Sequence, residues 1–248
     1  MKPILFNTDM VRGILDGRKT VTRRLVKFKP RQNPQWTGYI PDGPVLYGSN
    51  NIPASKSPYH PGDILYVRET WAKRASDRCN GVETGRCSFE ACETAPGPCF
   101  SEEYIYKATD SLPTYGGKWR PSIHMPKEAA RLFLWVTDVQ VERLLTPFFS
   151  DGAAVLALKK EGRVLPQECV ECIGNYDKPA CVDSSDDSEC GILDEIRGDF
   201  SDLWNSTIKP ADLPLYGWDA NPWVWVIEFE RISKEAALKV CKTDGRIM

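Results

Sequence analysis

The sequence predicts an α+β fold, in which a small β-barrel carries flanking helices and two cysteine-rich insertions. Two observations favour it. The chain opens with a strand–helix–strand pattern over residues 3–26, and a strand over residues 221–232 has apolar residues that alternate. A third observation argues against a doubly wound sheet, because strands and helices alternate too unevenly for regular βαβ units.

The first element is a short apolar strand, "PILF", over residues 3–6. Asn7 or Thr8 can cap the helix that follows, since short polar side chains accept hydrogen bonds from the first turn. Gly17 stands where a helix C-cap belongs. Residues 19–26, "KTVTRRLV", are rich in β-branched residues and predict the second strand. The apolar stripe of the helix is Met10, Val11, Ile14 and Leu15.

The middle of the chain begins with residues 28–60, whose density of Pro, Gly and Asn predicts a long loop. A Pro-Gly-Asp turn then precedes a strand from Ile64 to about Thr70. Residues 102–108 predict another strand, and residues 121–144 predict a helical turn followed by a long strand.

The last third of the chain contains two predicted helices before the closing strand. Residues 147–162 have an apolar side, and residues 192–207 are amphipathic. Residues 233–248 predict a short helix or a frayed end. The apolar side of the first helix is assigned to Ala153, Ala154, Leu156, Ala157 and Leu158, and the closing strand alternates through Trp223, Trp225, Ile227 and Phe229.

Charge is distributed unevenly along the chain, although its net value is only −2. Residues 1–31 hold nine Lys/Arg and two Asp, whereas residues 161–205 hold twelve Asp/Glu and three Lys/Arg. The basic segment is suited to phosphate, or the two segments balance each other within one fold. No apolar run has the length of about 18 residues that a membrane helix needs, and the N-terminus lacks a signal-peptide pattern. We therefore expect a cytoplasmic protein with no membrane partner.

Eight of the nine cysteines fall into two groups of four, each within an insertion, over residues 73–102 and 163–194. Such short segments have no hydrophobic periodicity and cannot fold by burying apolar side chains. Structural zinc held by thiolates would stabilise them instead. Disulfides and one zinc site shared by both groups are the alternatives. The ninth cysteine, Cys241, is expected to be free. The candidate zinc ligands are Cys79, Cys87, Cys92 and Cys99 in the first group and Cys169, Cys172, Cys181 and Cys190 in the second.

The segment "ILDGRKTVTRR", residues 14–24, resembles the opening motif of ASCH domains, which are small β-barrels related to the PUA RNA-binding fold. It is especially similar to the motif of the bacterial N4-acetylcytidine amidohydrolases. "PGDILYVRETW", "VERL" and "WVWVIEFERI" fit the same domain in the same order, as in the longer ASCH proteins of phages and prophages. The resemblance implies a single domain over residues 1–248, with a PUA-like core over about 1–72, 103–162 and 195–232.

Three catalytic roles are implied by this resemblance. The motif lysine is the proton acceptor, the second threonine the nucleophile, and a later glutamate the proton donor, which match Lys19, Thr22 and Glu161. Glu161 is chosen because it precedes Gly162 near the end of a predicted helix. The chemistry requires a base beside the weakly nucleophilic hydroxyl, and a lysine serves as one only when its pKa is lowered. Alternatively, Lys19 belongs to a solvated strand edge, and Glu161 is a solvated residue at the end of a helix.

Further residues are candidates for substrate binding. Arg18, Arg23 and Arg24 could lower the pKa of Lys19 or contact phosphate. Glu69 is the second candidate for the catalytic glutamate. Alternatively, it pairs with Arg68 or Arg24 at a strand edge. Trp71 could stack on a nucleobase or serve in the core.

The residues and the resemblance together predict a protein that binds nucleic acid or a modified nucleoside, with hydrolysis through Lys19, Thr22 and a carboxylate as a further option. RNA is favoured over DNA as the nucleic acid. An N4-acetylcytidine-type amidohydrolase is the first alternative. A ribonuclease is the second, although the sequence singles out no pair of acid and base for a phosphodiester.

Overall fold

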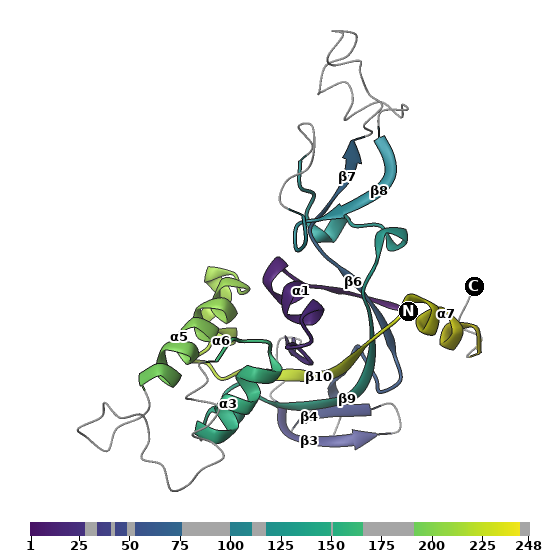
Figure 1. Ribbon diagram of the computed structural model, residues 1–248. Helices are drawn as coiled ribbons and strands as arrows, with labels where there is room; N and C mark the ends of the chain where they lie inside the picture. Colours follow the sequence, from purple (N-terminus) through teal and green to yellow (C-terminus); the bar gives the residue numbers. More distant parts are fainter. Residues whose placement is uncertain are drawn as a thin grey trace, which may run out of the picture. The chain divides into compact units, whose positions relative to one another are not determined.

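The computed structural model describes most of the chain (Figure 1). The described residues are 1–27, 34–40, 43–48, 53–75, 100–110, 118–149, 151–165 and 191–243. The chain divides into two compact units. Unit 1 comprises Met1–Leu15, Ile64–Trp135 and Arg231–Met248, and unit 2 comprises Asp16–Asp63 and Val136–Glu230.

The helices and strands appear in unit 1 largely where the sequence predicts them. The Asn7 side chain accepts a hydrogen bond from Met10 N–H (2.8 Å), so Asn7 caps α1, and Val11 and Ile14 are buried. The helical option for the tail is confirmed by α7. The elements of unit 1 are β1 (Lys2–Leu5), α1 (Thr8–Leu15), β6 (Ile64–Arg68), β7 (Trp71–Ala75), β8 (Phe100–Tyr106), two 3₁₀ turns (Ser122–His124 and Lys127–Ala129), the start of β9 (Phe133–Arg143) and α7 (Lys234–Thr243).

Unit 2 contains the remaining strands and most of the helices. Its elements are β2 (Val21–Leu25), β3 (Pro34–Ile40), β4 (Gly43–Gly48), β5 (Pro53–Lys56), the rest of β9, a 3₁₀ turn (Thr146–Phe149), α3 (Asp151–Lys160), α5 (Gly191–Ser206), a second 3₁₀ turn (Pro210–Asp212), α6 (Leu213–Tyr216) and all but the last two residues of β10 (Trp223–Ile232).

The principal sheet has the strand order β1-β6-β9-β10-β2. β1 pairs with β6 in parallel, whereas β6–β9 and β10–β2 are antiparallel, so the sheet is mixed. Within the described residues β1 and β2 are its edges, so the fold is α+β but the predicted closed barrel is not observed. β9 and β10 lie side by side as the longest strands (Figure 1).

The prediction of a long loop over residues 28–60 is wrong. β3, β4 and β5 form a three-stranded antiparallel sheet with two register shifts. Val45 and Leu46 are fully buried, although prolines and glycines surround them. Pro and Gly are tolerated at strand ends and bulges, which is where Pro34, Gly43 and Gly48 stand in the register.

The strand predicted from Ile64 to about Thr70 is found as β6, whereas β7, which precedes residues 76–99, was not predicted. β7 pairs with β8 in an antiparallel ladder from Trp71↔Tyr106 to Ala75↔Phe100. Residues 76–99 therefore connect two paired strands. All eight cysteines of the predicted zinc sites lie outside the described residues, and Cys241 is buried and free.

Two apolar clusters hold the helices of unit 2 in place. Ala154, Val155 and Leu158 of α3 pack with Ile196 and Phe200 of α5. The predicted apolar side of α3 was partly wrong, because Leu156 is 56% exposed whereas Val155 is buried. A second cluster joins Val21 of β2 to Leu144, Trp204, Val224 and Val226. Residues Val224–Ile227 are buried consecutively, because β10 is covered on both faces rather than on one.

No helix among the described residues is long and apolar enough to span a bilayer.

Candidate functional site

The opening motif is fixed by backbone contacts to the end of α3 and to β10. Gly17 has φ +72°, which lets the chain turn after α1. Thr20 N–H donates to the carbonyl of Lys160 (2.9 Å), and Phe229 N–H donates to the carbonyl of Thr20 (2.9 Å). Lys19 and Glu161 form an isolated antiparallel bridge. Lys19 is therefore anchored just before β2 begins, opposite Glu161, the residue that follows α3.

Lys19 and Glu161 form a buried ion pair. Lys19 Nζ donates to Glu161 Oε2 (2.5 Å), to the carbonyl of Glu161 (3.1 Å) and to the carbonyl of Val21 (2.7 Å). Their side chains are 1% and 5% exposed. Two residues that lie 142 positions apart thus share one buried site. Each charge is stabilised there by the other, because either one alone would be buried without a counter-charge.

Arg23 extends the ion pair into a chain of charges. Its Nη1 donates to Glu161 Oε1 (2.9 Å), and its Nη2 donates to Glu142 Oε1 (3.2 Å). Lys19 and Arg23 therefore engage different oxygens of Glu161, while Glu142 on β9 balances the charge of Arg23. Glu142 was not singled out by the sequence analysis, because only the pairing of strands reveals a partner from β9.

Arg24 follows Arg23 on β2 and is half-buried. Burial lowers the pKa of Arg24, while Glu161 and Tyr59 act in the opposite direction. Burial also raises the pKa of Tyr59. Alternation along β2 puts Arg23 and Arg24 on opposite faces of the strand, yet both act on Glu161. β2 is an edge strand of the sheet among the described residues.

The protonation of the central pair follows from burial and charge. Burial lowers the pKa of Lys19, and the positive charges of Arg24 and Arg23 add to this, while Glu161 opposes it. For Glu161, burial favours the neutral acid, but Lys19 and Arg23 together hold its pKa below the ordinary value. The pair thus combines a lysine that loses its proton more readily than usual with a carboxylate that stays ionised.

Gly162 allows the close approach of the two segments. It has φ +84°, and a Cβ added there would lie 2.8 Å from Lys19 Cβ and 3.3 Å from Lys19 Cα. Any side chain at this position would therefore meet Lys19 itself. Arg18 Nη1 also donates to the Gly162 carbonyl, and its Nη2 pairs with Asp16 (2.7 Å). Arg18 thus lies at the more exposed margin of the site.

Thr22 is buried on β2, where it is 2% exposed and in register with Ile227 of β10. It lies on the face opposite Val21, as the alternation of the strand requires. The sequence-predicted residues that the structure brings into contact are Lys19, Arg23 and Glu161, with Thr22 and Arg24 in the same strand as Arg23.

Glu69 and Trp71 belong to unit 1 and have other contacts there. Arg131 binds both carboxylate oxygens of Glu69 (2.9 and 3.0 Å), so neither Arg68 nor Arg24 is needed as its partner. Arg68 Nε instead donates to the Met125 carbonyl (2.8 Å). Trp71 is 3% exposed and packs in an apolar cluster with Ile64 and Phe133. These contacts fit roles in the core of unit 1.

Within the described residues, no group of three or more His, Cys, Asp or Glu side chains is arranged to hold a metal ion. Comparison of the chain with protein-family models, curated proteins and solved structures finds no match.

Proposed function

We propose that this protein binds a modified nucleoside at the Lys19–Glu161 site and hydrolyses an amide on its base, as the resemblance to N4-acetylcytidine amidohydrolases implies, on a PUA-like fold. The observation that carries the proposal is the contact between Lys19 and Glu161. The resemblance assigns catalytic roles to both, and they meet at 2.5 Å in a buried site. Strongly perturbed ionisable groups of this kind concentrate at functional sites.

The proposed chemistry begins with proton transfer from Lys19 to a carboxylate oxygen of Glu161, which leaves a neutral amine and a carboxylic acid. The Thr22 hydroxyl then attacks the acetyl carbon, and its proton passes to Lys19. As the C–N bond breaks, the exocyclic nitrogen takes a proton from Glu161 and leaves as an amine. Water hydrolyses the acetyl-threonine ester, releasing acetate and restoring the hydroxyl. Arg23 opposes the first transfer, because it favours the ionised form of Glu161.

Thr22 provides the sharpest test of this chemistry, because its substitution leaves the ion pair intact. We expect the wild-type protein to release acetate from N4-acetylcytidine. Thr22→Val should abolish turnover, since valine keeps the shape and removes the nucleophile, whereas Thr22→Ser should retain measurable activity. Acetate is quantified by NMR, and circular dichroism checks the fold. Equal rates for Thr22→Val and wild type would contradict the role of Thr22.

Binding without turnover is a second candidate function, and one observation favours it. An ammonium group has three hydrogens to donate, and three acceptors surround Lys19 Nζ at hydrogen-bond distance. If Lys19 only binds, these three acceptors hold it as a cation, against the effect of burial. In that case wild type would bind N4-acetylcytidine or single-stranded RNA but release no acetate, and Arg24→Gln should weaken binding. RNA is the nucleic acid that the PUA-like resemblance favours.

Structural zinc remains part of the proposal, on the grouping of the eight cysteines alone. Protein purified without added metal should contain one or two equivalents of zinc by elemental analysis. Replacing the pair Cys169 and Cys172 with serine should reduce that content. Less than about a tenth of an equivalent in wild type would favour disulfides instead.

A further inference from the structure

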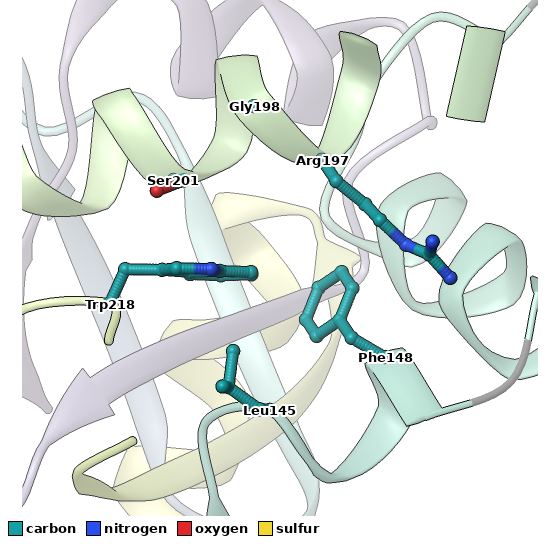
Figure 2. A pocket seen from close by; sticks show the side chains of 6 residues that line it. All are labelled: Leu145, Phe148, Arg197, Gly198, Ser201 and Trp218. Atoms are coloured by element: carbon teal, nitrogen blue, oxygen red, sulfur yellow. The ribbon is translucent and has the colours of Figure 1, made fainter. Parts of the chain in front are cut away.

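A hollow in unit 2 lies apart from the charged site, and neither Lys19 nor Glu161 lines it. Its volume is about 330 Å³, at the lower end of the range of about 300–1,000 Å³ for small-molecule sites. Figure 2 shows the α5 residues above the Trp218 ring, with Leu145 below and Phe148 beside it. The lining residues are Leu145, Phe148, Arg197, Gly198, Ser201 and Trp218.

Two aromatic rings, those of Phe148 and Trp218, line this hollow, and both contact the ring of Phe200, which does not line it. Phe148 and Trp218 meet edge to face with their ring centroids 5.0 Å apart, and Phe200 lies 5.8 Å from Phe148 and 5.9 Å from Trp218. The three rings brace one another, and Trp218 N–H donates from its backbone to Asn205 Oδ1 (2.9 Å). A wall held in this way is pre-formed, so a planar ring can stack on it without first ordering the side chains.

Gly198 keeps the hollow open on the side of the helix. Glycine within a helix is less favourable than alanine by about 0.5–1 kcal/mol. Gly198 has no left-handed backbone angle that would require glycine, and an added Cβ would meet nothing within 4 Å. Neither backbone nor packing thus requires a glycine here. The absence of a side chain at Gly198 leaves open space on this side of the hollow.

The charges around the hollow select against an anion. Arg197 Nη1 pairs with Asp194 (3.1 Å), so the cation of the lining is already neutralised. Asp194, Glu195, Asp199 and Asp202 of α5 are all exposed. Asp199 pairs with Arg163 (2.9 Å), as Asp194 does with Arg197, so the excess negative charge of the helix rests on Glu195 and Asp202. A phosphate or carboxylate would therefore approach a negative helix. The Ser201 side chain adds one neutral group that can donate or accept a hydrogen bond.

We infer that this hollow is a second binding site, for an uncharged planar heteroaromatic ring of the size of a nucleobase. The ring stacks on Trp218 under the opening left by Gly198, with one edge against Phe148, whose ring is inclined by 67° to that of Trp218, and with one polar edge toward Ser201. A free nucleoside and a base of an RNA strand present the same ring. The acidic helix favours the free nucleoside, because a strand would bring its phosphates against that helix.

Adenosine is the probe. Adenosine monophosphate, which carries the same nucleoside with a charged phosphate, is the control. Adenosine should shift the NMR signal of the Trp218 indole N–H, which is assigned by its loss in Trp218→Phe, and the monophosphate should bind at least tenfold more weakly. Gly198→Leu should weaken adenosine binding at least tenfold while the fold is retained, since leucine favours the helix and fills open space. Glu195→Leu, which adds the same side chain at an exposed position of α5 outside the lining, should leave the affinity unchanged.

These experiments test the second binding site independently of the proposed hydrolase activity. No adenosine-induced shift of Trp218 at millimolar concentrations would overturn the site, and wild-type affinity in Gly198→Leu would overturn its location. Equal affinity for adenosine and its monophosphate, or tighter binding of a short single-stranded RNA, would overturn the preference for an uncharged ligand. Acetate release from N4-acetylcytidine is unaffected by Gly198→Leu if the two sites are independent.

Discussion

Glu161→Leu should lower the free energy of unfolding by about 3–5 kcal/mol, because it leaves the Lys19 ammonium buried without its carboxylate. Arg23 loses a partner at the same time, although Glu142 still accepts from its Nη2. Urea denaturation followed by circular dichroism measures the change. This is the largest effect expected from a single side chain of the site, because the carboxylate is bound by two cations.

A double substitution provides the control for this prediction. Lys19→Met combined with Glu161→Leu removes both members of the pair, so no ammonium remains buried without a counter-charge. The double variant should be more stable than the sum of the two single effects predicts, by about 0.5–3 kcal/mol for residues in contact. Additive effects within experimental error would show that the two side chains do not depend on each other.

Gly162→Ala should be nearly as damaging, by about 2–5 kcal/mol, since it adds left-handed backbone strain and overpacking against Lys19. The added methyl would lie 2.8 Å from Lys19 Cβ, so either Lys19 or the turn after α3 has to move. Because that movement disturbs the bridge between Lys19 and Glu161, activity should fall with stability. Denaturation and acetate release are measured on the same preparations.

Gly62 supplies a matched control within the same unit. It has φ +87°, close to that of Gly162, but an added Cβ meets nothing within 4 Å. Gly62→Ala therefore tests the backbone strain alone, and it should cost about 1–3 kcal/mol less than Gly162→Ala, which is the overpacking contribution. Equal effects of the two substitutions would mean that the approach of Gly162 to Lys19 does not constrain the site.

Local patterns predicted the elements whose signals are local. The α1 helix has a capping side chain, an apolar stripe and a glycine after its end, and all three have their expected positions in the structure. Residues 34–56 gave the opposite result. Their sheet depends on pairing between neighbouring strands, and prolines at the strand ends obscured the pattern. β7 was missed for a related reason, because 24 residues separate its end Ala75 from its partner Phe100. The strand predicted over residues 102–108 is found as β8.

The charged site was predictable in part. The contact of Lys19 with Glu161 was implied by the resemblance of the opening motif, together with the glycine after Glu161. The role of that glycine became clear only from its 2.8 Å approach to Lys19. Glu142 and Tyr59 carried no signal in the sequence, because they enter the site from a distant strand and from the turn after β5. Tertiary pairing, rather than local composition, determines which acid meets which base.

Direct titration of Lys19 tests the central claim, that a buried lysine of lowered pKa shares one site with Glu161. The measurement is the pH dependence of side-chain NMR signals in protein labelled with ¹⁵N-lysine, with Lys19 assigned by its loss in Lys19→Met. We predict that Lys19 titrates below its ordinary pKa of 10.5, since burial and the two arginines favour the neutral amine. In Glu161→Gln the pKa of Lys19 should fall further, because the carboxylate that raises it is gone. A Lys19 signal that titrates at 10.5 in both proteins would contradict the account.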